Sequence, residues 1–212
     1  MFTGLVTDVG RVVSIEGGER LARIVIESAY DPATIALGAS IACAGPCLTA
    51  VSIAPHGSGC RFAVDAAAET LARTTVGAWR EGTRVNLERS LKLGDEMGGH
   101  LVTGHVDGVA EIVARETVTG EDNPWGASER FTLRAPAALA GFIAEKGSVC
   151  LDGTSLTVNT VDGTDFSVLL IPHSLSVTTW EDRRAGDRVN LEVDLIARYA
   201  ARLAEARGLM QG

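Results

Sequence analysis

Residues 3–10 read Thr-Gly-Leu-Val-Thr-Asp-Val-Gly, and residues 103–110 read Thr-Gly-His-Val-Asp-Gly-Val-Ala. Both stretches begin with Thr-Gly and carry valine at their fourth and seventh positions. A chain of 212 residues can form one large domain or two domains of about 100 residues each. The recurrence of one stretch in both halves favours two domains related by duplication.

Three further blocks recur in the same order along the two halves. They are residues 45–51 and 153–159, residues 69–75 and 173–179, and residues 82–88 and 186–192. One match could arise by chance, whereas four matches in one order indicate duplication, and a period of about a hundred residues is too long for a solenoid. The chain therefore divides into residues 1–97, residues 98–194 and a tail of residues 195–212.

Each half carries short runs of alternating or β-branched residues, which are typical of strands, and glycines separate these runs. In the first half the runs include residues 23–27, 40–43, 48–53 and 84–88. About six such strands in each half favour a small barrel, because closure leaves no exposed sheet edge. The sequence predicts an all-β fold of two tandem barrels, with short helices near residues 31–37 and 135–145.

The tail has a different pattern, which predicts a C-terminal α-helix. Asp194 can cap a helix that runs from Leu195 to about Arg207, and Gly208 can end it. A narrow apolar stripe along this helix consists of Leu195, Ile196, Tyr199 and Leu203. From the pattern alone, the stripe packs either on its own barrel or against the same helix of other subunits.

The composition excludes several classes of function. Lys and Arg number 19 against 27 Asp and Glu, and the net charge of −8 repels the phosphates of nucleic acids. No apolar run approaches the ~20 residues that span a bilayer. The opening residues lack the basic and apolar regions of a signal peptide. These features predict a cytoplasmic protein with no nucleic-acid partner and no membrane partner.

The four cysteines do not form a metal-binding pattern. Cys43, Cys47, Cys60 and Cys150 contain no Cys-x-x-Cys pair, and no cluster of histidines accompanies them. We therefore predict free thiols and no metal site. The sequence also lacks a phosphate-binding loop and a dinucleotide-binding glycine motif.

Three matched positions exchange one type of side chain for another inside otherwise similar blocks. The exchanged pairs are Leu5 and His105, Cys47 and Ser155, and Glu69 and His173. Two similar halves predict two similar pockets for two similar ligands. The exchanges predict that the two pockets have different roles.

Several polar residues are candidates for chemistry, each with a structural alternative. His105 and the neighbouring His100 lie in a glycine-rich stretch and suit acid–base work, unless either is an ordinary surface or core histidine. Ser155 is not part of a Gly-x-Ser-x-Gly motif, so its hydroxyl is expected to donate a hydrogen bond or add to an electrophilic ring. Cys47 is either a polar pocket group or a buried apolar thiol.

Asn86 and Asn190 occupy the same place in the repeated block Val-Asn-Leu-Glu. A polar side chain among strand residues commonly ties down neighbouring backbone, and we expect that role here. Lys146 precedes a predicted strand and is either solvated or part of a pocket.

The ordered, duplicated set of motifs resembles one family. These motifs are Met1–Gly4, Gly-x-Cys-Leu-Thr at residues 45–49, the stretch 98–107, Gly-x-Ser-Leu-Thr-Val at residues 153–158, and Leu-Ile-Pro-His-Ser-Leu at residues 170–175. Together they resemble riboflavin synthase of the alpha-chain type, over essentially the whole chain. Any one motif is weak evidence, whereas the complete set is highly specific.

The resemblance implies two six-stranded Greek-key barrels and a C-terminal helix that assembles a homotrimer. It implies a dismutation in which one molecule of 6,7-dimethyl-8-ribityllumazine gives a four-carbon unit to another, forming riboflavin and 5-amino-6-ribitylamino-uracil. No cofactor is implied, because the substrate is its own donor and acceptor. The active site is expected between the N-terminal barrel of one subunit and the C-terminal barrel of another, and lumazine synthase is a further candidate partner.

The resemblance also assigns pocket residues by position. The candidates for catalysis are His105, Ser155, Cys47 and Thr157. For the partner site it indicates Phe2, Thr3, Gly4, Leu5 and Val6. For the first-barrel pocket it indicates Ser40, Cys47, Leu48, Thr49, Asp65, Ala66, Ala67, Ala68, Glu69 and Thr70. For the second-barrel pocket it indicates Gly104, His105, Val106, Lys146, Ser155, Leu156, Thr157, Leu170, Ile171, Pro172, His173, Ser174 and Leu175, with Asp194 nearby.

One position departs from the family pattern, because Pro46 precedes the cysteine and removes a backbone N–H. The alternative function is a non-catalytic protein that binds lumazine or flavin. Such relatives tend to lose reactive groups in one barrel, whereas Cys47 and Ser155 are both present here. The sequence therefore favours the enzyme.

Overall fold

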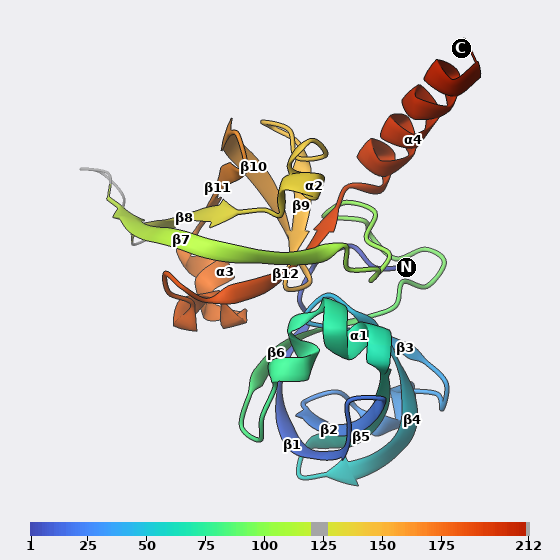
Figure 1. Cartoon of the computed structure of the whole chain (residues 1–212). Helices are drawn as coiled ribbons and strands as arrows, with labels where there is room; N and C mark the ends of the chain where they lie inside the picture. Colours follow the sequence, from blue (N-terminus) through green and yellow to red (C-terminus); the bar gives the residue numbers. More distant parts are fainter. Residues whose placement is uncertain (120–126, 211–212) are drawn as a thin grey trace.

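The computed structural model describes residues 1–119 and 127–210. Two closed barrels follow one another along the chain, and a C-terminal helix projects away from both (Figure 1). The predicted all-β fold of two tandem six-stranded barrels with a C-terminal helix is confirmed.

The first barrel has six antiparallel strands in the order β1-β2-β5-β4-β3-β6. Their bounds are Asp8–Gly18 for β1, Leu21–Ser28 for β2, Ser40–Cys43 for β3, Cys47–His56 for β4, Gly59–Ala67 for β5 and Arg84–Arg89 for β6. Three short helical segments connect them, namely η1 at Pro32–Thr34, α1 at Ala68–Arg73 and η2 at Thr75–Ala78.

The second barrel repeats this topology. Read from its first strand, the order is β7-β8-β11-β10-β9-β12. The strands are β7 at Gly108–Val118, β8 at Ser128–Arg134, β9 at Ser148–Leu151, β10 at Thr154–Asp162, β11 at Asp165–Leu170 and β12 at Arg188–Val193. The helical segments are α2 at Ala137–Ala140, α3 at Pro172–Ser176 and η3 at Thr179–Asp182. The shared strand order is the structural counterpart of the duplication in the sequence.

Strict alternation along the strands builds a separate core in each barrel. In β2, Ala22 and Ile24 are buried while Arg23 between them faces solvent, as the period of two requires. The second core contains the edge-to-face pair Phe131 and Trp180, whose ring centroids are 4.9 Å apart. Each barrel therefore has the apolar interior that an independent domain needs.

The helix predictions were less accurate than the strand predictions. The helix expected near residues 31–37 is only the 3₁₀ turn η1, and the one expected near residues 135–145 is only the four residues of α2. The pattern did not predict α1 or α3, because each is too short to show a helical period. These two short helices follow β5 and β11, the strands that lead to the predicted pockets.

The C-terminal helix α4 spans Leu195–Met210, so the prediction that Gly208 ends it was wrong. Asp194 does cap it, because the Ile196 N–H donates to Asp194 Oδ1 at 2.7 Å. Arg198 in the first turn pairs with Asp107 of the second barrel at 2.8 Å. The side chains of Ile196, Tyr199 and Leu203 remain exposed, which contradicts the alternative that the stripe packs on its own barrel.

Candidate active site

The first residues of the two repeats meet between the barrels. Phe2 and Val102 form an antiparallel bridge, and each N–H donates to the carbonyl of the other at 2.7 and 3.0 Å. Both side chains are buried in a small apolar cluster with Ala42 of β3 and Cys150 of β9. The segments that open the two repeats are therefore fixed at the interface of the barrels.

From this bridge each segment continues onto the opposite barrel. The Gly4 carbonyl accepts the N–H of Ser155 in β10 at 2.8 Å, and the Gly104 carbonyl accepts the N–H of Cys47 in β4 at 2.8 Å. Both glycines have a positive φ, +76° and +78°. A Cβ on Gly4 would lie 2.6 Å from the Ser155 Cβ, and a Cβ on Gly104 would lie 2.5 Å from the Cys47 Cβ. Only glycine allows this close approach.

This crossing corrects one sequence-based grouping. The sequence placed Gly104, His105 and Val106 with the second-barrel pocket, whereas Gly104 packs on Cys47 of the first barrel. Conversely, Gly4 packs on Ser155 of the second barrel in the same chain. The strand pattern could not reveal this crossing, because it does not show on which barrel the segments before β1 and β7 pack.

Ser155 forms a close polar pair with His100, since the Oγ lies 2.6 Å from Nδ1. Burial lowers the pKa of His100 below 6.5, although the carboxylates of Asp194 and Glu192 act in the opposite direction. The imidazole is therefore neutral at pH 7, and in the tautomer that carries its proton on Nε2, its Nδ1 can accept the serine proton. Its Nε2 has no hydrogen-bond partner among the described residues. A serine beside a neutral histidine is an arrangement that activates a hydroxyl.

The structure thus brings His100, and not the predicted His105, to Ser155. His105 is exposed, and its side chain makes no hydrogen bond to the residues that the structure describes. The sequence did show both histidines in one glycine-rich stretch, but the comparison of repeats drew attention to His105, because its counterpart is Leu5. The contact between His100 and Ser155 joins positions 55 residues apart, which no local pattern reveals.

The first-barrel candidates lie around the start of β4 and the end of β5. Ser40 pairs with Thr49 across β3 and β4, beside the half-buried Cys47. Asp65 forms an ion pair with Arg23 at 2.7 Å, and this partner lowers the pKa of its carboxyl. Leu48 and Ala66 face the core, whereas Ala67, Ala68 and Glu69 are exposed and Thr70 is half-buried.

The second-barrel candidates follow the same plan. Ser155 and Leu156 are half-buried, and Thr157 and Lys146 are exposed. Lys146 has a φ of +64°, which is uncommon for a residue with a side chain. Leu170 faces the core, and the predicted far wall continues through Ile171 into α3, where Pro172, Ser174 and Leu175 are half-buried and His173 is exposed.

The remaining thiols are poor nucleophiles. Burial raises the pKa of Cys43 and Cys150 far above that of a free thiol, and burial also raises the pKa of Cys60. Cys47 is the one cysteine that is only half-buried. Within residues 1–119 and 127–210, no group of three or more His, Cys, Asp or Glu residues has the arrangement of a metal site. No helix in the described part of the chain is long and apolar enough to cross a membrane.

Comparisons with known proteins agree with the two-barrel arrangement. The family described as Lumazine binding domain matches residues 3–90 and residues 103–194. A riboflavin synthase from Brucella abortus (strain 2308) is 59% identical over 206 residues, covering 97% of this chain and 98% of the relative. A riboflavin synthase from Mycobacterium tuberculosis (strain ATCC 25618 / H37Rv) is 42% identical over 211 residues, covering 98% of this chain and all of the relative.

Solved structures with the same fold include LumP in complex with riboflavin. The TM-score is 0.76 at 22% identity, and the match covers 91% of this chain and 99% of that chain. LumP in complex with 6,7-dimethyl-8-(1'-D-ribityl) lumazine matches with a TM-score of 0.74 at 21% identity, over the same shares of the two chains. At these identities the likeness shows the fold alone.

Proposed function

The chain belongs to the riboflavin synthase family, and from this premise we propose that it catalyses the dismutation of two 6,7-dimethyl-8-ribityllumazine molecules. One molecule loses a four-carbon unit and the other gains it, so that the products are riboflavin and 5-amino-6-ribitylamino-uracil. Because donor and acceptor are the same compound, the reaction balances without an oxidant or a reductant.

One observation carries the proposal for this chain. Each barrel presents a polar reactive group, Cys47 or Ser155, at the same place of the repeat, directly beneath a glycine of the other repeat. Two equivalent pockets suit a reaction whose two substrates are identical. The presence of a reactive group in both barrels favours an enzyme over a protein that only binds lumazine or flavin.

The chemistry requires a proton acceptor and a nucleophile. The C7 methyl group of the lumazine is acidic, because its carbanion delocalises into the electron-poor ring. The neutral His100 can accept the Ser155 proton across 2.6 Å as the serine oxygen attacks the ring. Alternatively, the Ser155 hydroxyl orients a water whose proton passes to His100 as the water attacks. Cys47 is proposed as a polar support in the first-barrel pocket, and His105 and Thr157 as further groups for proton transfer.

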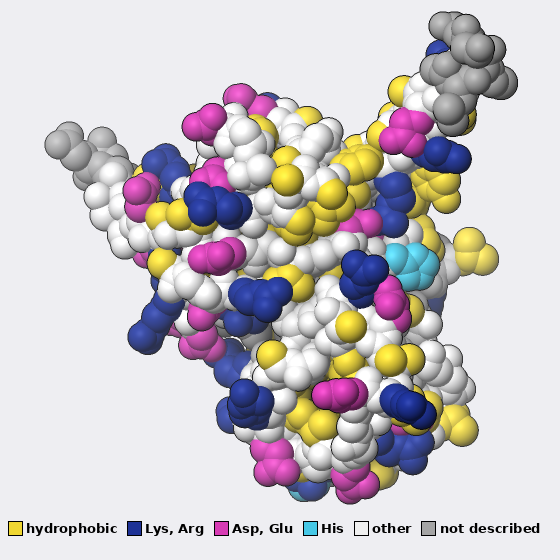
Figure 2. Space-filling view, in the orientation of Figure 1, with side chains coloured by type: hydrophobic (Ala, Val, Ile, Leu, Met, Phe, Trp, Pro, Cys, Tyr) yellow, Lys and Arg dark blue, Asp and Glu magenta, His cyan; other side chains and the backbone are white. Residues whose placement is uncertain are grey.

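Much of the rate acceleration is expected from holding two flat rings face to face. Fixing two reactants in a productive geometry can lower the barrier by about 7–11 kcal/mol. We propose that the two rings meet between the first barrel of one subunit and the second barrel of another. The exposed apolar residues of α4, which Figure 2 shows along the projecting helix, support assembly into a homotrimer through this helix.

We also propose a cytoplasmic location, which the four free thiols support, because cysteines stay reduced in that compartment. Association with lumazine synthase is a further proposal. It rests on chemical logic alone, since that enzyme would supply the substrate. Co-sedimentation of the two purified proteins would test it.

The function is tested by incubating the purified protein with 6,7-dimethyl-8-ribityllumazine alone. Growth of riboflavin absorbance, with one riboflavin formed for every two lumazines consumed, is the expected result. Tight binding of the lumazine without formation of riboflavin would instead establish the non-catalytic alternative.

A further inference from the structure

The repeated block Val-Asn-Leu-Glu provides four buried polar residues at the interface of the barrels. Asn86 and Glu88 belong to β6, and Asn190 and Glu192 belong to β12. Each side chain is at most 5% exposed. Because residues two apart on a strand point to the same side, each Asn and its Glu face the same neighbour. Buried polar side chains need partners, and these partners show what the block does.

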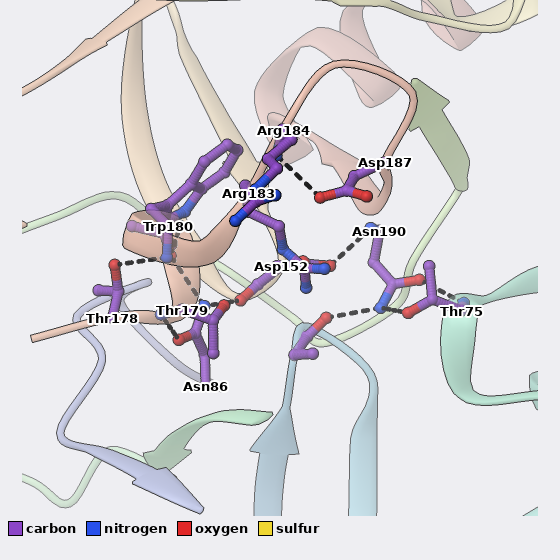
Figure 3. Close-up of polar contacts among 12 residues, drawn as sticks. Thr75, Asn86, Asp152, Thr178, Thr179, Trp180, Arg183, Arg184, Asp187 and Asn190 are labelled. Carbon is purple, nitrogen blue, oxygen red and sulfur yellow. Dashed lines mark hydrogen bonds and ion pairs between the residues drawn. The ribbon is translucent and has the colours of Figure 1, made fainter. Parts of the chain in front are cut away.

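Asn86 of the first barrel bonds to the backbone of the second barrel. Its Nδ2 donates to the Asp152 carbonyl at 2.9 Å, and its Oδ1 accepts the Thr179 N–H at 2.8 Å (Figure 3). Asp152 lies in the turn that leads into β10 and Ser155, and Thr179 follows α3. One amide therefore links the two sides of the second-barrel pocket.

Asn190 of the second barrel makes the reciprocal contacts with the first. Its Nδ2 donates to the Ala44 carbonyl at 2.8 Å. Its Oδ1 accepts the Thr75 N–H at 2.7 Å, and Figure 3 shows Asn190 beside Thr75. Ala44 lies in the turn that leads into β4 and Cys47, and Thr75 follows α1. The expectation that both asparagines tie down backbone is confirmed, and the backbone belongs in each case to the opposite barrel.

Glu88 reaches the second-barrel pocket through one intermediate segment. Its carboxylate accepts the Thr3 N–H at 2.7 Å, the Thr3 hydroxyl at 2.7 Å and the Gly4 N–H at 2.9 Å. Gly4 in turn accepts the Ser155 N–H through its carbonyl. The carboxylate thus fixes the backbone N–H groups of Thr3 and Gly4, and Gly4 is the residue that contacts the Ser155 backbone.

Glu192 repeats this arrangement toward the first-barrel pocket. Its carboxylate accepts the Thr103 N–H at 2.7 Å, the Thr103 hydroxyl at 2.7 Å and the Gly104 N–H at 3.0 Å. The Gly104 carbonyl then accepts the Cys47 N–H. Hydrogen bonds to an ionised group are stronger than neutral ones, so both segments are held firmly.

We propose that the Asn-x-Glu pair of each barrel positions the reactive side chain of the opposite barrel. Asn86 and Glu88 position Ser155, and Asn190 and Glu192 position Cys47. The proposal deepens the proposed function and rests on it, because it takes Ser155 and Cys47 as pocket residues. It implies that a change within one barrel impairs the pocket of the other.

The matched substitutions Glu88→Gln and Glu192→Gln test this crossed relation. Glutamine keeps the size of the side chain but turns one accepting oxygen into an NH₂ group, which cannot accept a glycine or threonine N–H. Hydrogen–deuterium exchange by NMR would follow the amides of Ser155 and Cys47 in the full-length protein. In Glu88→Gln we expect exchange at Ser155 to accelerate about tenfold or more, as for the loss of a hydrogen bond to a charged group, with little change at Cys47.

In Glu192→Gln the expected pattern is reversed, so that each variant is the control for the other. Equal acceleration at both amides, or acceleration confined to the mutated barrel, would overturn the proposal. If Glu88→Gln does not fold, Thr3→Val is the second variant, which removes the hydroxyl bond to Glu88 and the bond from the Leu5 N–H to the same hydroxyl. The exchange rates of the Ser155 and Cys47 amides are then compared in the same way. This readout does not require turnover, so it is independent of the proposed activity.

A double-mutant cycle measured on kcat/KM tests whether Glu88 affects activity through Ser155. Residues that act through one another give non-additive effects, whereas independent residues give additive ones. We expect Glu88→Gln to be non-additive with Ser155→Ala and additive with Cys47→Ser. Additivity with both would show that Glu88 is only structural. An absence of turnover in the unchanged protein would refute the proposed function and leave the exchange result standing.

Discussion

Ser155 differs from its counterpart Cys47 in its neighbour, because its Oγ lies 2.6 Å from the ring nitrogen of a neutral histidine. Kinetic measurements can therefore distinguish a catalytic role of Ser155 from a role in substrate binding alone. A group that acts in the transition state changes kcat, whereas a group that only binds changes KM.

We predict that Ser155→Ala lowers kcat much more than it weakens binding. Acid–base groups contribute about 10²- to 10⁴-fold to a rate, and the loss is expected near the lower end of that range. Steady-state kinetics and equilibrium binding of the lumazine would be measured on one preparation. Cys47→Ser is the control and should keep partial activity, since the hydroxyl preserves polarity. Unchanged turnover in Ser155→Ala would remove the residue from the chemistry.

The protonation of His100 predicts a pH dependence. Burial lowers its pKa below the 6.5 of a free imidazole. Activity should therefore hold at neutral pH and fall only at a pH below the usual titration range of a free imidazole, because protonation of Nδ1 removes the nitrogen that accepts the serine proton. The same shift makes folding less favourable in acid, since the unfolded chain binds the proton more readily.

A pH profile of kcat for the unchanged protein and for His100→Asn would check this prediction. The asparagine does not titrate, so the acid limb assigned to His100 should disappear, at a lower plateau of activity. An acid limb that persists unchanged in His100→Asn would assign the titration to another group.

At the scale of elements, the segments that precede β1 and β7 depend on glycine. Gly104 has a φ of +78°, and a Cβ at this position would lie 2.5 Å from the Cys47 Cβ and 2.9 Å from its backbone nitrogen. Neither the backbone conformation nor the close contact tolerates a side chain.

Gly104→Ala is therefore expected to lower the free energy of unfolding by about 1–3 kcal/mol, the range for a strained backbone position. Denaturant unfolding would measure the change. Gly141→Ala is the matched control, because Gly141 has a helical φ and a Cβ there would meet nothing within 4 Å. Equal stabilities of the two variants would show that the segment carrying Gly104 adapts without cost.

At the scale of the whole molecule, each barrel has its own core, and α4 leaves an apolar stripe exposed. Barrels with separate cores can remain folded without the helix. In the assembly that we propose, this helix would bring pockets of different subunits together. Its loss should affect the encounter of two rings more than the binding of one.

We predict that a chain ending at Asp194 keeps both barrels folded and still binds lumazine. It should lose most catalysis, because the effective concentration of the second ring falls. Sedimentation, circular dichroism and activity would be measured on the same sample. A monomer with full activity would contradict a site between subunits and place both rings within one chain.

The sequence alone determined the duplication, the two closed barrels and the terminal helix. The signals for these features can be read from short stretches of sequence. They are the repeated blocks, the strand period of two in β2 and the capping residue Asp194. The same locality explains the errors. Helices as short as α1 and α3 have no period to recognise, and Gly208 did not end α4.

Only the tertiary structure decided which parts of the two repeats meet. The pairing of His100 with Ser155, the crossing of Gly4 and Gly104, and the reach of Asn86 to Thr179 join positions 55 or more residues apart. A strand pattern specifies which side of a strand is buried but not which barrel covers it. That choice follows from packing between the barrels, where each buried polar group must find a partner across the interface.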